Sequence, residues 1–193
     1  YYRKQIQNGS GIFLDQHHPN LFFVRHWAAM FDGIIFLYLR RPTHQVVASM
    51  LRHNGVMGWY KYARNWRQRI FKSIPYPNQF LGLSQFRYID QLPPHLLGAH
   101  RVLAHQYAYE RLVVEMNGAL RLVHYEALVN DPLAELTRVF TPEEIDSLGT
   151  FSLVEIPNAQ SISKYRDVLS DEQVAEIDAL ERQIGSSNKP PQV

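Results

Sequence analysis

An apolar run that ends in two arginines and a proline sets the strongest limit on the possible folds of this chain. Residues 34–39 read Ile-Ile-Phe-Leu-Tyr-Leu and are followed by Arg40, Arg41 and Pro42. A short run rich in β-branched and aromatic residues is typical of a strand buried on both faces. Beyond the proline, apolar residues recur at helical spacing up to about residue 53. We therefore predict a buried strand, a basic turn and a helix.

The basic turn is a candidate anion site. Ligands of open α/β sheets bind at the carboxyl ends of strands, and a guanidinium offers a planar fork of donors that matches phosphate oxygens. Ser49 follows Arg41 by eight residues and adds a hydroxyl from the predicted helix. We predict a phosphate clamp of Arg41 and Ser49, with Arg40 as the alternative arginine. The competing interpretation is a pair of surface arginines without a ligand.

The rest of the chain alternates predicted strands with predicted helices. Residues 12–14 and 120–126 have strand character, and helical patterns cover 20–31, 58–74 and 94–116, with further helices after Asp131, Thr141 and Ser170. This alternation predicts an α/β fold, a parallel sheet flanked by helices. We expect one domain over residues 1–185, a disordered tail over 186–193, and a long loop at 75–94 that covers a substrate.

Composition excludes several classes of protein. The 193-residue chain contains no cysteine, so it has no disulfide scaffold, thiolate metal site or cysteine nucleophile. A net charge of +2 does not indicate a nucleic-acid partner, and no apolar run reaches the roughly 20 residues that span a bilayer. We expect no metal, no nucleic-acid partner, no membrane segment in this chain and a cytoplasmic location.

The segment at residues 34–50 resembles the 3'-phosphate-binding segment of sulfotransferases that use 3'-phosphoadenosine 5'-phosphosulfate (PAPS). In that family an apolar strand runs into an arginine, often within R-x-P, and a serine follows eight residues later. Arg41 and Ser49 have this spacing, whereas reading R-x-P literally makes Arg40 the phosphate ligand. The resemblance implies a P-loop NTPase-like, three-layer architecture.

Two later segments are similar to the same family. Residues 121–132, which read RLVHYEALVNDP, resemble its R-Y-E-D-L-x-x-D-P segment, which implies that Tyr125 sits against the adenine. An aromatic ring at a strand end has a suitable stacking face, although a tyrosine of the core is the alternative. Residues 163–170 resemble the late K-W-R-x-x-L-S segment. This likeness implies that Lys164 and Arg166 help to hold the 3'-phosphate.

The resemblance also implies a catalytic base. Many members carry a histidine at a strand end about 22 residues before the phosphate-binding arginine, and His18 precedes Arg41 by 23 residues. A neutral imidazole has the pKa needed to take a proton from an acceptor near neutral pH. His17 matches the family's K-T-H register and His18 matches the spacing to Arg40, so both stay candidates.

One expected motif is absent from the sequence. The family's phosphosulfate-binding loop, a Gly/Ser/Thr-rich turn between a strand and a helix, has no match here, because the turn at residues 8–11 is followed by strand character. The resemblance covers residues 12–180, and we expect a family member truncated at its N-terminus. The lack of a Gly-x-x-x-x-Gly-Lys loop also argues against an ATP-dependent phosphotransferase.

The implied activity is transfer of a sulfonate group from PAPS to a hydroxyl or amine of a small-molecule or carbohydrate acceptor. The product nucleotide is 3'-phosphoadenosine 5'-phosphate (PAP), and no metal takes part. The alternative is a non-catalytic relative that binds phosphorylated or sulfated ligands.

Overall fold

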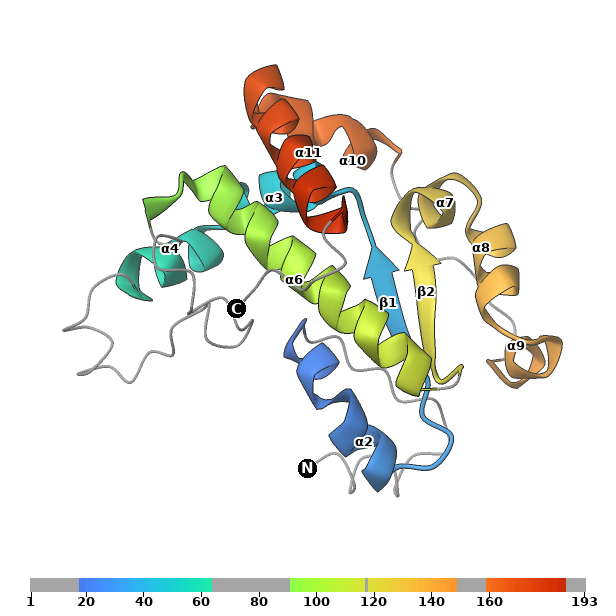
Figure 1. Ribbon diagram of the computed structural model, residues 1–193. Coiled ribbons are helices and arrows are strands. Elements are labelled where there is room, and N and C mark those ends of the chain that lie inside the picture. The colour runs from blue at the N-terminus through green and yellow to red at the C-terminus, as the bar shows by residue number, and fades with distance from the viewer. Residues whose placement is uncertain (1–17, 64–90, 117, 149–158, 187–193) are drawn as a thin grey trace.

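The computed structural model describes residues 18–63, 91–116, 118–148 and 159–186. Its elements, shown in Figure 1, are in chain order η1 (His18–Phe23), α2 (Val24–Met30), β1 (Phe36–Arg40), α3 (Thr43–Arg52), α4 (Asn54–Ala63), α6 (Pro94–Glu115), β2 (Leu120–His124), α7 (Tyr125–Asn130), α8 (Pro132–Val139), α9 (Pro142–Leu148), α10 (Gln160–Ser163), η5 (Lys164–Asp167) and α11 (Asp171–Ser186), where η marks a 3₁₀ helix.

The two strands in the described part of the chain pair in parallel. Phe36 lies opposite Leu120, and Arg40 lies opposite His124. A parallel pair needs a long crossover, and α3, α4 and α6 lie within it. The parallel pair and its flanking helices confirm the predicted α/β class.

Helix α6 covers one face of this sheet (Figure 1). Tyr38 of β1 stacks on Tyr109 of α6 with ring centroids 4.5 Å apart. Phe36 packs against an apolar cluster that contains Leu112 and Leu120. Burial raises the pKa of the Tyr38 phenol to about 12, because a phenolate would have to be desolvated there.

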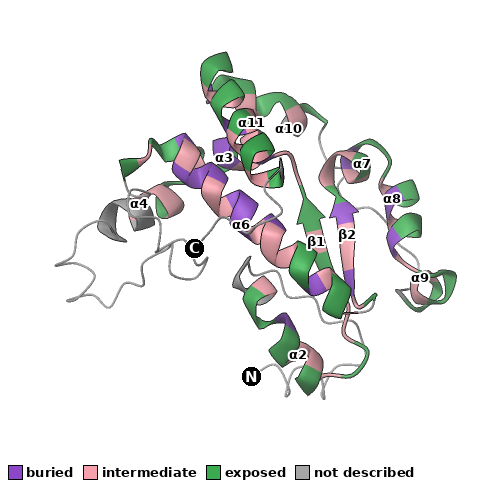
Figure 2. Cartoon of the chain, viewed as in Figure 1, coloured by how far each residue is buried: buried purple, intermediate pink, exposed green. Residues whose placement is uncertain are grey.

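A second core joins α3, α6 and α11. Val47, Ala99 and Ile177, one from each helix, are completely buried, and Figure 2 shows buried positions along α3 and α6. Helices α3 and α6 meet at Gly98, where a Cβ would stand 3.4 Å from Val47 Cγ1, at van der Waals contact. This core supports the helix that follows the basic turn.

The prediction that the first strand is buried on both faces was wrong. Leu37 and Leu39 are 44% and 49% exposed, and they alternate with the residues that face α6. The opposite face of the sheet is covered at β2, where Val123 is buried and α8 packs beside the strand (Figure 1). Since α8 lies against β2, the leucines of β1 keep access to solvent.

Capping chemistry places several helix starts where the sequence predicted them. Asp131 Oδ1 accepts a hydrogen bond from Ala134 N at 3.0 Å. Glu144 N donates to Thr141 Oγ1 at 3.3 Å and Gln173 N donates to Ser170 Oγ at 3.2 Å, as expected for capping boxes. The predicted starts of α8, α9 and α11 are confirmed.

One predicted boundary was wrong. The sequence predicts a helix over residues 58–74, but α4 already begins at Asn54. His53 Nδ1 accepts the N–H of Val56 at 3.2 Å, which caps the new helix one residue after α3 ends. The remainder of that predicted helix, the 75–90 part of the loop and the predicted strand at 12–14 lie outside the described residues.

Candidate functional site

The ends of the two strands bring Arg41 and Tyr125 together. Arg40 and His124 are opposite each other in the parallel register, so the next residues leave the sheet side by side. The Arg41 guanidinium carbon lies 4.4 Å from the centre of the Tyr125 ring, within the range of a cation–π contact. These two predicted site residues are distant in sequence and adjacent in the fold.

Arg41 is also held from α3. Its Nε donates to Gln45 Oε1 at 2.8 Å, and Gln45 Nε2 donates to Glu126 Oε1 at 2.8 Å. Gln45 is buried, with 3% of its surface exposed. Sequence reasoning missed Gln45 and Glu126, although the spacing of four from Arg41 to Gln45 and the position of Glu126 after Tyr125 were visible signals.

Arg40 lies in a different electrostatic environment. Burial raises the pKa of Tyr38 and of Tyr109, and the positive charge of Arg40 partly offsets both increases. The Arg40 charge therefore acts on the phenols of Tyr38 in β1 and Tyr109 in α6. Of the two candidate arginines, Arg41 is the one that contacts Tyr125.

Helix α3 carries two further polar residues, Thr43 in its first turn and Ser49 further along the helix. Ser49 is exposed, and its spacing of four from Gln45 places it on the same side of the helix. Thr43, at the first position of α3, is only 1% exposed, and its Oγ1 has no hydrogen-bond partner among the described residues. The positive N-terminal end of the α3 dipole and the positive charge of Arg41 would both attract an anion.

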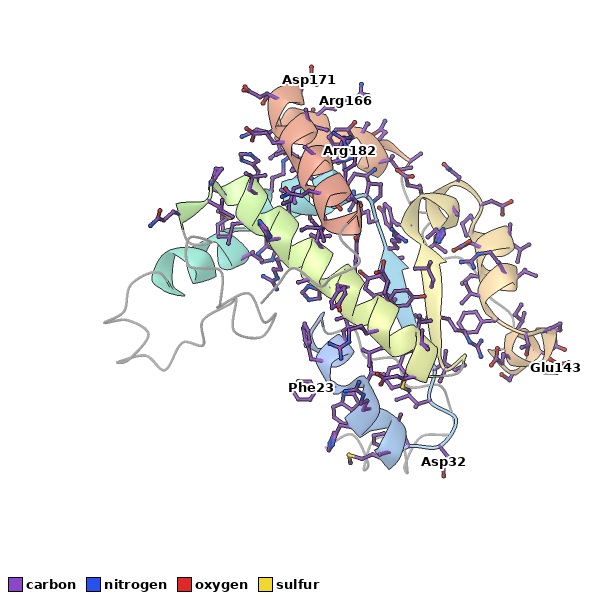
Figure 3. All side chains as sticks on the ribbon, in the orientation of Figure 1. Phe23, Asp32, Glu143, Arg166, Asp171 and Arg182 are labelled. Atoms are coloured by element: carbon purple, nitrogen blue, oxygen red, sulfur yellow. The ribbon has the colours of Figure 1, made fainter. Side chains whose placement is uncertain are left out.

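The late basic segment packs against the same helix. The ring of Tyr165 in η5 lies 4.4 Å from the imidazole of His44 in the first turn of α3. Lys164 and Arg166 flank Tyr165 and are exposed, and Figure 3 shows Arg166 close to α11. Arg166 Nε donates to Tyr165 Oη at 3.3 Å, which raises the pKa of the guanidinium. The segment thus lies near the start of α3, with its cations facing solvent.

A buried carboxylate fixes the end of β2 just before Tyr125. Glu135 Oε1 accepts the His124 N–H at 2.6 Å, and Arg138 donates to both carboxylate oxygens. These bonds, chiefly those from Arg138, lower the pKa of Glu135 to about 2. Arg138 Nη2 also donates to Leu122 O at 2.7 Å. Helix α8 therefore holds the strand end that positions Tyr125.

The structure does not describe the side chains of the two candidate bases. His17 lies outside the described residues, as does the side chain of His18, whose backbone begins η1. The proposed role of either histidine stays a prediction.

Within the described ranges, no group of three or more metal-ligating side chains is present and no helix has the length and apolar character to cross a bilayer. Comparisons with protein-family models, curated proteins and solved structures found no significant match.

Proposed function

We propose that this chain is a PAPS-dependent sulfotransferase and that its parallel strand pair belongs to the three-layer, P-loop NTPase-like architecture of that family. The observation that carries the proposal is the contact of Arg41 with Tyr125 at the strand ends. One ribose joins the adenine and the 3'-phosphate of PAPS, so the groups that bind them must be neighbours. A guanidinium for the phosphate and an aromatic ring for the base meet this requirement.

The family resemblance supplies the remaining roles. Arg41, with Ser49 from α3, holds the 3'-phosphate and so positions the donor. Lys164 and Arg166, on the segment that packs against α3, add positive charge nearby.

In the reaction, His17 or His18 takes the proton of an acceptor hydroxyl or amine as the acceptor attacks sulfur. The bond between sulfur and the bridging oxygen breaks, and PAP leaves. The acceptor is a small molecule or a carbohydrate.

Calorimetric titration with two nucleotides tests the proposal. PAP and adenosine 5'-monophosphate (AMP) differ only in the 3'-phosphate, so the wild-type chain should prefer PAP. Arg41→Ala should weaken PAP binding about 10- to 100-fold, as expected for loss of a charged hydrogen-bonding group, with little effect on AMP. Arg111→Ala, at an exposed position of α6, is the matched control. No preference for PAP in the wild type would refute the proposed function.

Two further variants refine the test. If Arg40→Ala, rather than Arg41→Ala, removes the preference for PAP, the phosphate ligand is Arg40. A chain with both His17→Ala and His18→Ala should lose sulfonate transfer while keeping its affinity for PAP. Transfer unchanged in that chain would exclude both histidines as the base. PAP binding without transfer in a protein that includes the phosphosulfate-binding loop would identify a non-catalytic binder.

A further inference from the structure

Gln45 is a buried amide whose two ends face groups of opposite character. Its oxygen accepts from Arg41 Nε and its nitrogen donates to Glu126 Oε1, both at 2.8 Å. An ionised carboxylate only accepts hydrogen bonds, and a guanidinium only donates them. If the amide were reversed, its nitrogen would face the Arg41 Nε donor and its oxygen would face the Glu126 acceptor. Glu126 and Arg41 therefore both favour the observed orientation of the Gln45 amide.

Contacts from α3 and from Tyr125 both orient the Arg41 side chain. The Gln45 amide holds Nε from α3, while the Tyr125 ring lies against the guanidinium. An arginine side chain that is free to rotate loses considerable rotamer entropy when it binds a ligand. Because this side chain is already oriented, a phosphate that meets its Nη groups binds at a lower entropic cost.

We propose that Gln45 and Glu126 are positioning residues that orient Arg41 for the 3'-phosphate, an inference that rests on the proposed function. Glu126 acts through Gln45: its carboxylate holds the amide, and the amide holds the guanidinium. The pair joins α3 to α7, the helices that follow the two strands. The orientation of the phosphate ligand is thereby coupled to the segment that carries Tyr125.

A double-mutant cycle on the full chain tests this coupling, with PAP and AMP affinities as the readout. Glu126→Ala should reduce the preference for PAP over AMP about three- to tenfold. In an Arg41→Ala background the same change should have less than about a twofold effect, because residues that act through one another are not additive. Glu126→Gln keeps an oxygen that can accept from Gln45 and should restore most of the preference. Glu110→Ala, at an exposed position of α6, is the control.

The outcomes separate this inference from the function on which it rests. If the wild type does not prefer PAP, the proposed function has failed. If it does, and Glu126→Ala lowers only the unfolding temperature, the Gln45–Glu126 bond merely joins two helices and the inference is wrong. Equal effects of Glu126→Ala with and without Arg41 would also overturn it. In the ligand-free chain, NMR relaxation of the Arg41 Nε–H should show greater motion in Glu126→Ala, and an unchanged order parameter counts against the inference.

Discussion

Replacing Glu135 with glutamine should destabilise the protein in a pH-dependent manner. The Glu135 carboxylate is 5% exposed and accepts hydrogen bonds from His124 N at 2.6 Å, Arg138 Nε at 2.9 Å and Arg138 Nη2 at 2.6 Å. Glutamine keeps the shape, but it replaces one acceptor oxygen with a donor and removes the charge. At least one of the three donors then loses its partner.

The magnitude follows from the pKa of the carboxyl group. Hydrogen bonds from Arg138, with a further one from the His124 N–H, lower the pKa of Glu135 from 4.5 to about 2, and burial opposes this change. The folded state therefore favours the ionised form, and the contribution is complete above pH of about 4.5 and is lost as pH falls toward 2. At 1.36 kcal/mol for each pKa unit, the difference corresponds to at most about 3.4 kcal/mol.

Solvent reduces this upper limit. Arg138 is 50% exposed, and water around it screens the ion pair, so we expect about 1.5–2 kcal/mol at pH 7. Urea unfolding followed by circular dichroism measures the free energy of unfolding of the wild type and Glu135→Gln. The difference between them should shrink from pH 5 to pH 3, whereas Glu110→Gln should stay near the wild type at every pH. A pH-independent difference, or none at pH 7, would refute the reasoning.

Two further substitutions should raise stability in the same urea experiment. Gly98→Ala should raise the free energy of unfolding by about 0.5–1 kcal/mol through helix propensity, because the new Cβ meets Val47 Cγ1 at 3.4 Å without a clash. The larger side chain of Gly98→Val should destabilise the protein. A loss of stability in Gly98→Ala would contradict this packing. Thr43→Val should add about 1 kcal/mol, since it removes a buried hydroxyl without a hydrogen-bond partner among the described residues. Thr137→Val, which removes a hydroxyl that donates to Leu133 O, should not stabilise, and equal effects of the two valines would be inconsistent with this explanation.

Local chemistry made part of the structure predictable from the sequence. The apolar run before Arg40, the proline after Arg41 and the following helical spacing correspond to β1, a turn and α3. Ser170 begins α11 through a capping box that four consecutive residues encode. Such features depend on interactions between residues close in sequence, so the patterns that predict them span only a few residues.

The contacts between residues of the candidate site required tertiary structure. The spacing to Ser49 favoured Arg41 with Arg40 as the alternative, but only the parallel register shows that Arg41 lies against Tyr125. The link from Gln45 to Glu126 likewise joins residues 81 positions apart, and no local pattern encodes that pairing.

The exposure of Leu37 and Leu39 was also decided in three dimensions. An apolar run indicates that a strand can be buried, but it does not indicate which helix or strand covers each face. Burial depends on where α6 and α8 pack, and those positions follow from the combined packing of distant segments. Local sequence therefore encodes the helices, the strands and the residue types at their ends. Tertiary packing selects which of those residues meet, because contact between distant segments is a property of the whole folded chain.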